Sequence, residues 1–406
     1  MRFRVLNKPA SDRVESIDVF RGLTILAMIF VNDLASITGI PGWMKHMPTE
    51  VDGMTFVDLV FPAFLFIVGV AIPFAIDKRL RRGDSYLQIW KHILIRTTGL
   101  IILGILMVNI GNLNEEYTGM DKNLWVVLLF VSVILVWNQY SHERGKIRFI
   151  FYLLRSIGIC VLVYLAAIYR GGTESELTWF KTSWWGILGL IGWAYLISCT
   201  LYFIFRNHHA AMVGMVAFLI LLFVGDTEGI LNFLQPVSDV VWIGGHIGTH
   251  SAITVSGIVV SMLFFGENKN LSPLKRILWI LIFALFIYLT GCFLRPHYIV
   301  SKNLATPSWG LFSISICSVI FAFLYWLIDL KKKNWWVFFI RPAGVNPLLA
   351  YILPFIVYAL IGLFEITYLK DNFGHGSIGI VRSVVFTLIM VGFTNMLTKL
   401  RIRLHL

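Results

Sequence analysis

Residues 56–76 read FVDLVFPAFLFIVGVAIPFAI, and the only charged residue among them is Asp58, near the start. A helix that crosses a bilayer needs about 20 mostly apolar residues. Similar stretches occur at 19–38, 93–110, 124–137, 149–169, 184–205, 210–224, 248–265, 276–294, 308–328, 346–368 and 380–398. The sequence therefore predicts an all-α, polytopic transmembrane helix bundle of about twelve helices, or of ten to eleven if 124–137 and 210–224 do not cross.

The composition of the 406-residue chain agrees with this interpretation. Hydrophobic residues make up 58%, charged residues only 14%, and the mean hydropathy is +0.79. Soluble domains carry about 25% charged residues, so a soluble enzyme, a disordered protein and a disulfide scaffold are excluded. The first residues are polar and the first apolar stretch is long enough to span, so we expect no cleavable signal peptide.

The charges predict the orientation. If the N-terminus is cytoplasmic, 26 of the 34 Lys and Arg fall on the cytoplasmic side, and 14 of the 22 Asp and Glu fall on the other side. This distribution predicts a multi-pass protein of a bacterial-type inner (plasma) membrane with both termini in the cytoplasm. The net charge of +12 then reflects topology and contact with anionic lipids, so we expect no nucleic-acid partner.

Four polar residues are expected to meet at one extracytoplasmic mouth. Asn32 and Asp33 end the first stretch, His46 lies in loop 39–55, and Asp58 opens the next stretch. Ionisable residues at this depth are expensive and usually face a cavity. A histidine beside a carboxylate and an amide supplies a general base, its orienting group and a polar anchor. The alternatives are an interfacial loop histidine for His46 and a helix N-cap for Asp58.

This hairpin resembles the transmembrane acyltransferase family of heparan-α-glucosaminide N-acetyltransferase and its bacterial relatives, the DUF5009 and YeiB-like groups. The similarity is specific over the first 80 or so residues and weaker beyond them. It is carried by Ser16-Ile17-Asp18-Val19-Phe20-Arg21-Gly22, Val31-Asn32, Lys45-His46, Asp58-Leu59-Val60-Phe61-Pro62 and Phe66-Ile67-Val68-Gly69, with weaker matches at Arg96, Ser301-Lys302-Asn303-Leu304 and Gly344-Val345-Asn346-Pro347.

The resemblance implies an N-acetyltransferase that takes an acetyl group from cytoplasmic acetyl-CoA and passes it to an amino sugar or glycan on the far side. It implies His46 as base or acyl acceptor, with Asn32 as its partner and Asp58 shaping the same site. Arg21 and Asn32 are eleven residues apart, about 16 Å along a helix, a span that an extended pantetheine arm covers.

The remaining candidate residues are assigned by depth and by resemblance. Donor binding is assigned to Arg21, Asp18, Arg96 and Asn346, although Asp18 and Arg21 also suit a helix-start ion pair and Asn346 a helix cap. The predicted substrate-binding residues are Asp33, Lys302, Asn303 and His250.

Two further patterns favour structural interpretations. His246 and His250 have the i,i+4 spacing of a metal pair, but no HExxH glutamate accompanies them, so we expect no metal. Trp309 and other tryptophans near span ends are interpreted as interface belts.

We interpret 1–406 as one integral-membrane acyltransferase-like domain. Residues 1–80 form its motif-bearing hairpin, and 124–169 form a helix pair inserted into the ten-helix core usual for the family. Its expected partners are the lipid bilayer, acetyl-CoA and the acceptor, and a homodimer is left open. Two other functions remain: a sugar or amino-sugar permease that uses His46 and Asp58 for substrate or proton coupling, and a non-catalytic partner of glycan enzymes.

Overall fold

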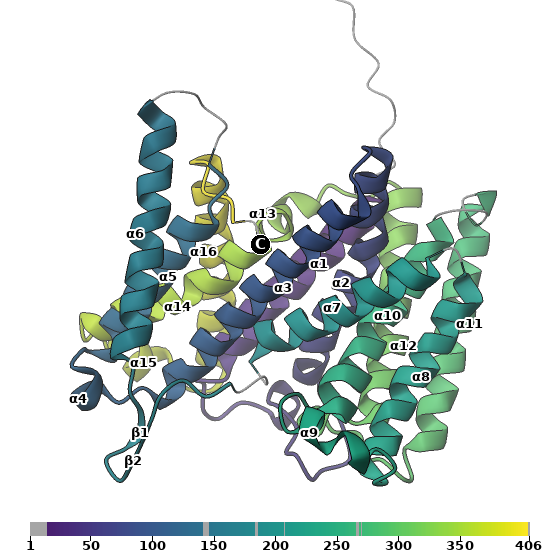
Figure 1. Ribbon diagram of the computed structural model, residues 1–406, viewed down its shortest axis with the longest axis horizontal. Coiled ribbons are helices and arrows are strands. Elements are labelled where there is room, and N and C mark those ends of the chain that lie inside the picture. The colour runs from purple at the N-terminus through teal and green to yellow at the C-terminus, as the bar shows by residue number, and fades with distance from the viewer. Residues whose placement is uncertain are drawn as a thin grey trace, which may run out of the picture.

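The computed structural model describes residues 14–140, 146–182, 186–206, 208–264, 268 and 270–404. Figure 1 shows a bundle of long helices with short connections at both ends. Within the described residues the extended elements are β1 (Gly171–Thr173) and β2 (Glu176–Thr178), which pair as a small antiparallel hairpin. The prediction of an all-α helical fold is therefore confirmed for the body of the chain.

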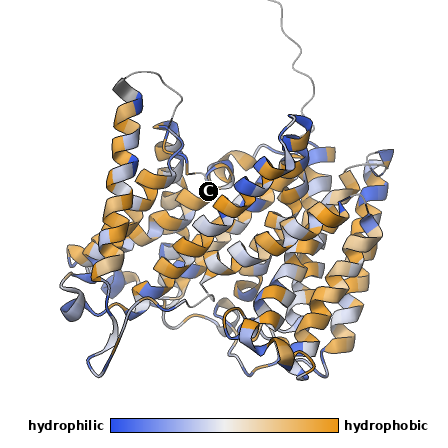
Figure 2. Cartoon of the chain, in the orientation of Figure 1, coloured by the Kyte–Doolittle hydropathy of each residue, from blue (hydrophilic) through white to orange (hydrophobic). Residues whose placement is uncertain are grey.

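Nine of the described helices are long and apolar enough to cross a membrane. Hydrophobic residues dominate them and hydrophilic residues gather near their ends (Figure 2). They are α2 (Phe56–Arg81), α3 with η2 (Tyr86–Asn109, Ile110–Asn112), α6 (Lys146–Ile168), α7 (Ile187–Phe205), α8 (His209–Thr227), η4 with α10 and η5 (Ile243–Thr249, His250–Ser261, Met262–Phe264), α11 (Pro273–Leu294), α12 with η7 (Pro307–Leu324, Tyr325–Leu330) and α16 (Gly376–Lys399).

Helices also occupy the other three predicted stretches. They are α1 (Glu15–Leu34), α5 (Lys122–Trp137) and α14 (Pro347–Leu363). The last two are shorter than the nine, and α1 carries charged residues at both ends. Residues 210–224, which looked short, lie in α8, whose 19 residues are enough to span. Shorter elements complete the described chain: η1 (Gly42–Met44), α4 (Glu115–Thr118), η3 (Asn232–Leu234), α9 (Gln235–Ser238), η8 (Val337–Phe339), α13 (Arg341–Val345) and α15 (Tyr368–Phe373).

The crossing of α2 and α10 forms the centre of the bundle, and every residue of α10 is buried. A Cβ atom at Gly69 would clash with the carbonyl oxygen of Thr254, and one at Gly257 with that of Phe66. Glycine is required on both helices because their backbones touch, as is common between membrane helices. The close packing fixes α2, whose first turn carries Asp58, within the core.

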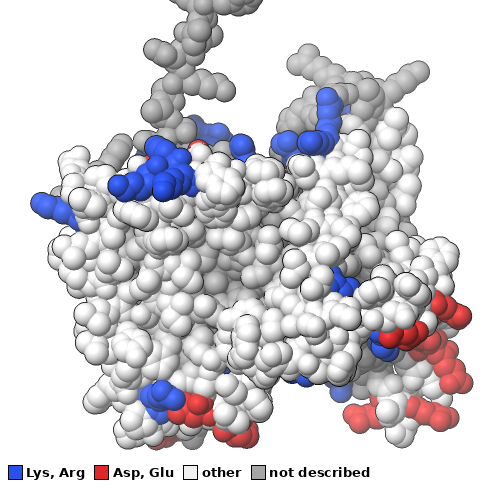
Figure 3. Space-filling view, turned by 180° about the vertical axis from the view of Figure 1, so that it is seen from behind, with Lys and Arg blue, Asp and Glu red and all other residues white. Residues whose placement is uncertain are grey.

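The periphery is more loosely attached. Helix α6 lies at one edge of the bundle, and most of its surface is exposed (Figure 1). Its partner α5 packs against α14, so the two helices of 124–169 lie side by side at this edge. On the face that Figure 3 shows, Asp and Glu gather near the lower rim, whereas Lys and Arg gather on the upper rim and also occur beside the acidic residues at the lower rim.

Candidate active site

Asp58 lies in the first turn of α2 and is almost fully buried. Its Oδ2 atom accepts hydrogen bonds from the backbone N–H of Thr55 (3.0 Å) and of Met47 (3.1 Å). The first bond satisfies a donor at the helix N-terminus, which otherwise lacks an intrahelical partner. The carboxylate therefore caps α2 and leaves Oδ1 facing the loop that precedes the helix.

His46 uses that second oxygen. Its Nδ1 atom lies 2.7 Å from Asp58 Oδ1, and the imidazole is about half exposed, at 48% of its side-chain surface, against 2% for Asp58. Because an ionised carboxylate only accepts hydrogen bonds, the proton of the neutral ring belongs on Nδ1 and the lone pair on Nε2. The pair thus presents a half-exposed base whose tautomer is set by a buried carboxylate.

The loop that carries His46 is bound to the loop between α11 and α12. Asp52 accepts hydrogen bonds from the Val300 N–H (2.8 Å) and the Arg295 guanidinium (2.9 Å). The Val300 hydrogen bond holds the pKa of Asp52 below its usual value, and Arg295 adds to this effect, while the slight burial of Asp52 opposes it. These contacts fix one loop on the other.

The second loop brings Lys302 to the imidazole. Its Nζ atom lies 3.3 Å from Nδ1 and 3.4 Å from Nε2 of His46. Burial lowers the pKa of Lys302, and the negative charge of Asp58 acts against that effect. Lys302 and its neighbour Asn303, whose amide donates to the Thr49 hydroxyl at 2.9 Å, both contact the loop that carries His46. Two of the predicted substrate-binding residues therefore lie beside the predicted base.

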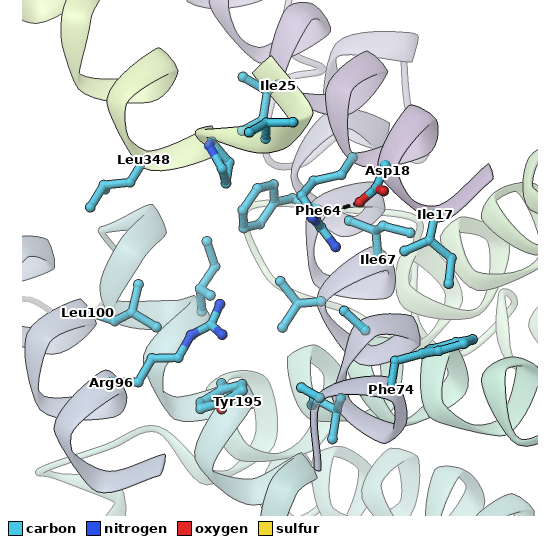
Figure 4. Close-up of a pocket in the computed structure, with 18 of the residues that line it drawn as sticks. Ile17, Asp18, Ile25, Phe64, Ile67, Phe74, Arg96, Leu100, Tyr195 and Leu348 are labelled. Atoms are coloured by element: carbon cyan, nitrogen blue, oxygen red, sulfur yellow. Dashed lines mark hydrogen bonds and ion pairs between the residues drawn. The ribbon is translucent and has the colours of Figure 1, made fainter. Parts of the chain in front are cut away.

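A cavity of about 650 Å³ opens on the other side of the same hairpin, between α1, α2, α3, α7 and the start of α14 (Figure 4). Its apolar inner wall reaches Met28 and Phe64. Its other end is basic and is lined by Arg21, Lys78, Arg79, Arg82, His92 and Arg96.

Three of the four predicted donor-binding residues line this cavity. Arg21 pairs with Asp18 at 3.3 Å, the helix-start pair that the spacing suggested, and donates to the Gly344 carbonyl at the same distance. Arg96 lies over the ring of Tyr195, 4.8 Å from its centroid, and its buried Nε atom has no hydrogen-bond partner among the described residues (Figure 4). A basic end and an apolar end suit a ligand with an anionic head and an uncharged arm.

Asn346 lies outside the lining of the cavity, between two residues that belong to it. Its amide donates to the Thr398 hydroxyl (3.0 Å) and the Ile402 carbonyl (2.8 Å), and its side-chain oxygen accepts from the Leu404 N–H (3.1 Å). Asn346 therefore joins the start of α14 to the C-terminal segment.

A family model described as a domain of unknown function, DUF5009, matches residues 13–244, more than half of the chain. The chain belongs to this family. It is also similar to heparan-alpha-glucosaminide N-acetyltransferase of Mus musculus, 33% identical over 134 residues (31% of this chain and 20% of the relative). The corresponding protein of Homo sapiens is 34% identical over 129 residues (30% and 19%), so the chain covers about a fifth of these curated relatives. The family recognised in the first hairpin is thereby confirmed.

At the C-terminal end of α1, two adjacent polar residues face different surroundings. Asn32 is exposed, and no hydrogen bond in the described part of the chain joins it to His46 or Asp58. Asp33 is buried, accepts a hydrogen bond from the Tyr358 hydroxyl and pairs with Arg382 at 3.3 Å. Asp33 therefore ties α1 to α14 and α16.

His250 packs against Trp309, which contacts the backbone of Asp58. It is buried in the first turn of α10, with its ring edge-on to Phe61 and Trp309 and stacked 5.9 Å from His246. Trp309 is fully buried and donates its Nε1–H to the Asp58 carbonyl at 3.3 Å, so its interpretation as an interface residue is wrong. Within the described residues, no cluster of three or more His, Cys, Asp or Glu is arranged to hold a metal ion.

Several partners of these residues come from distant parts of the chain and were not indicated by the sequence. Asp52 and Arg295 fix the two loops, Trp309 supports Asp58, and Tyr358 and Arg382 engage Asp33. One signal was available: Arg382 lies inside the apolar stretch 380–398, where an ionisable side chain needs a partner.

Proposed function

We propose that this protein is a membrane acetyltransferase that transfers the acetyl group of acetyl-CoA to the amino group of an amino sugar or glycan. The observation that carries the proposal is the His46–Asp58 pair at one end of the α1–α2 hairpin, with the basic cavity at the other end. The names of the mouse and human relatives point to the same chemistry.

The acceptor would react at His46. An ammonium group has no lone pair with which to attack a thioester, so the amine must lose a proton before or during attack. The Nε2 atom of His46 accepts that proton, and Asp58 stabilises the imidazolium that forms. Asn303, His250 and the exposed amide of Asn32 are the polar groups that we assign to holding the acceptor, whereas Asp33, already paired with Arg382, keeps α1 in position.

The donor would bind in the cavity as the acyl-donor substrate. Arg21, Arg79, Arg82 and Arg96 offer guanidinium groups to its phosphates, and the volume lies within the range of about 300–1,000 Å³ usual for small-molecule sites. Phe64, on the inner wall, is six residues from Asp58 along α2, a rise of about 9 Å. A donor bound with its arm in the apolar end therefore has its reactive end directed along the hairpin towards His46. Asn346 holds the start of α14, at the mouth of the cavity, in place.

The membrane arrangement is part of the proposal. We infer twelve spans, with α1, α5 and α14 added to the nine, both termini in the cytoplasm and the whole chain 1–406 acting as one domain in a bacterial-type inner membrane. The basic rim would then face cytoplasmic acetyl-CoA and His46 would face the far side. The pair α5–α6 is the proposed insertion 124–169, and the exposed surface of α6 would face lipid or a second copy of the chain.

The test is acetyl transfer by the purified protein in sealed vesicles. With acetyl-CoA and glucosamine supplied, we expect release of free CoA, and we expect His46→Ala to lower its rate about 10²–10⁴-fold. The matched control is His297→Ala, an exposed histidine on the loop that also carries Lys302, which should retain the wild-type rate. No CoA release by the wild type, or an equal rate in His46→Ala, would overturn the proposal.

A sugar permease is the second candidate. It is favoured by the π-helical turns η4 and η7 within two of the spanning helices, because irregular turns in such helices often mark functional sites. The same vesicles distinguish the two functions. Accumulation of labelled glucosamine without acetylation would support the permease, whereas acetylated product with CoA released in equal amount supports the transferase.

A further inference from the structure

Lys302 lies where the acceptor amine would have to lie. Its Nζ atom is within 3.3–3.4 Å of both nitrogens of the His46 imidazole. The Nδ1 proton is already given to Asp58, so the lone pair available to this amine is that of Nε2. An amino sugar that reacts with His46 as base must bring its own primary amine to the same atom. The protein thus holds a primary amine beside its own base.

The position of Lys302 is built into the fold. On either side of it, the Ser301 hydroxyl donates to the Thr49 carbonyl (2.9 Å) and the Asn303 amide to the Thr49 hydroxyl (2.9 Å). Both contacts reach the loop that carries His46. These contacts fix the backbone on both sides of Lys302, which keeps its side chain near the imidazole, while the side chain itself can still change its rotamer. Its lowered pKa increases the share of neutral, nucleophilic amine at a given pH.

We propose that Lys302 is an internal acetyl acceptor, so that the protein acetylates itself on this side chain when no acceptor is bound. This inference rests on the proposed acetyl transfer. The Nζ lone pair attacks the thioester carbonyl carbon, a C–N bond forms and the C–S bond breaks. His46 takes the proton lost by nitrogen, and CoA leaves as the thiolate, which that proton then neutralises. The product is an Nε-acetyl-lysine amide, with no net oxidation or reduction.

The modification would regulate the site. An amide is a far poorer acyl donor than a thioester, so the acetyl group stays on Lys302, and its bulk occupies the approach to Nε2. The acceptor competes for the same position, so bound amino sugar protects the lysine. In the presence of acetyl-CoA and the absence of acceptor, the protein would therefore inactivate itself by acetylation of Lys302.

The test uses the full-length protein in lipid vesicles with acetyl-CoA labelled in the acetyl group and no acceptor, followed by peptide mapping by mass spectrometry. Lys45 is the internal reference, because it is exposed and adjacent to His46 in sequence. We expect label on Lys302 at least about 100-fold above Lys45, since a positioned base contributes about 10²–10⁴-fold. Glucosamine should suppress the label, His46→Ala should abolish it, and Lys302→Arg should show none at that position.

Two results would overturn the inference: no label on Lys302 of the wild type, or equal labelling of Lys302 and Lys45, which would indicate reaction with acetyl-CoA in solution. A parallel sample measures CoA release with glucosamine. If that release continues while Lys302 stays unlabelled, the inference alone fails. If CoA release with glucosamine is absent too, the proposed function fails with it.

Discussion

Two buried carboxylates lie at the same end of the α1–α2 hairpin, and they differ in the partner that each has. Asp58 is bound to His46, whose side chain is 48% exposed, and Asp33 is paired with Arg382, whose side chain is 17% exposed. Each carboxylate has only 2% of its side-chain surface exposed. Burial alone therefore does not distinguish a carboxylate that orients a histidine from one that joins helices.

The partner makes the difference. An arginine keeps its proton at any pH that a protein meets, so the Asp33–Arg382 pair can only hold α1 against α16. A histidine changes charge near neutral pH and can accept a proton at one nitrogen while the other stays bound to the carboxylate. The same kind of buried acid thus clamps helices at one place and orients a base at the other.

Asp58→Asn should have the largest effect on the rate, because it changes how Asp58 orients His46. The asparagine amide donates to Nδ1 of His46, which moves the ring proton to Nε2 and removes the lone pair that the amine needs. We expect the rate of CoA release to fall about 10²–10⁴-fold. The asparagine oxygen takes the place of Oδ2 and still accepts the Thr55 and Met47 N–H groups, so we expect a stability loss of no more than about 1 kcal/mol in thermal unfolding. A rate within the error of wild type would show that Asp58 serves only as a cap.

Asp33→Asn should produce the opposite pattern. It leaves the Arg382 guanidinium with a neutral partner in a mostly buried site, and removal of one partner of a buried pair costs about 3–5 kcal/mol. We expect a loss near the lower limit, about 3 kcal/mol, because Arg382 is partly exposed, with CoA release per folded molecule much less affected than in Asp58→Asn. Arg382→Lys, which keeps the charge, should be destabilised less. If Asp33→Asn were as stable as the wild type but had the same loss of rate as Asp58→Asn, Asp33 would belong to the proposed active site.

The sequence predicts which end of a helix a residue occupies better than which way it points. The apolar stretches and charge asymmetry bring Asn32, Asp33, His46 and Asp58 to one end. Consecutive residues of an α-helix, however, point about 100° apart, so Asn32 and Asp33 face different surroundings although they have the same depth. His46 and Asp58 were predictable as a pair because only a short loop separates them.

Partners from distant elements could not be predicted in this way. Lys302 was a candidate because its loop lies at the same end, but its contact with His46 depends on how the two loops dock. The contacts that dock them include the Asp52–Arg295 pair, which joins residues 243 positions apart. From the sequence, each of these residues can be assigned a depth in the membrane, but the residues that it contacts cannot be predicted.

A pH series should sharpen the comparison at Lys302, which contacts the imidazole of His46. Neutral amine is the nucleophile, and burial lowers the pKa of Lys302, so its labelling by acetyl-CoA should rise at a lower pH than that of an exposed lysine. Lys45, followed in the same peptide map, is the exposed reference. Labelling of Lys302 only above the pH at which Lys45 reacts would contradict this expectation.

The smallest effect is expected at a third carboxylate pair, Asp52–Arg295, which is exposed and therefore worth less than about 1 kcal/mol. The folded pKa of Asp52 is lowered, so its contribution is present above the unfolded value of about 3.9 and is lost as the pH falls through the folded pKa. The Val300 N–H donates to Asp52, and the Gly53 N–H donates to the Val300 carbonyl at 3.0 Å. Below that pH the hydrogen-exchange protection of these two amides should decrease in the wild type, after correction for the intrinsic exchange rate. Asp52→Asn should show weaker protection already at neutral pH and no acid-dependent step. A wild type whose protection stays constant through this range would show that the loops dock without the charge on Asp52, and the comparison of carboxylates by their partners would then concern the buried pairs alone.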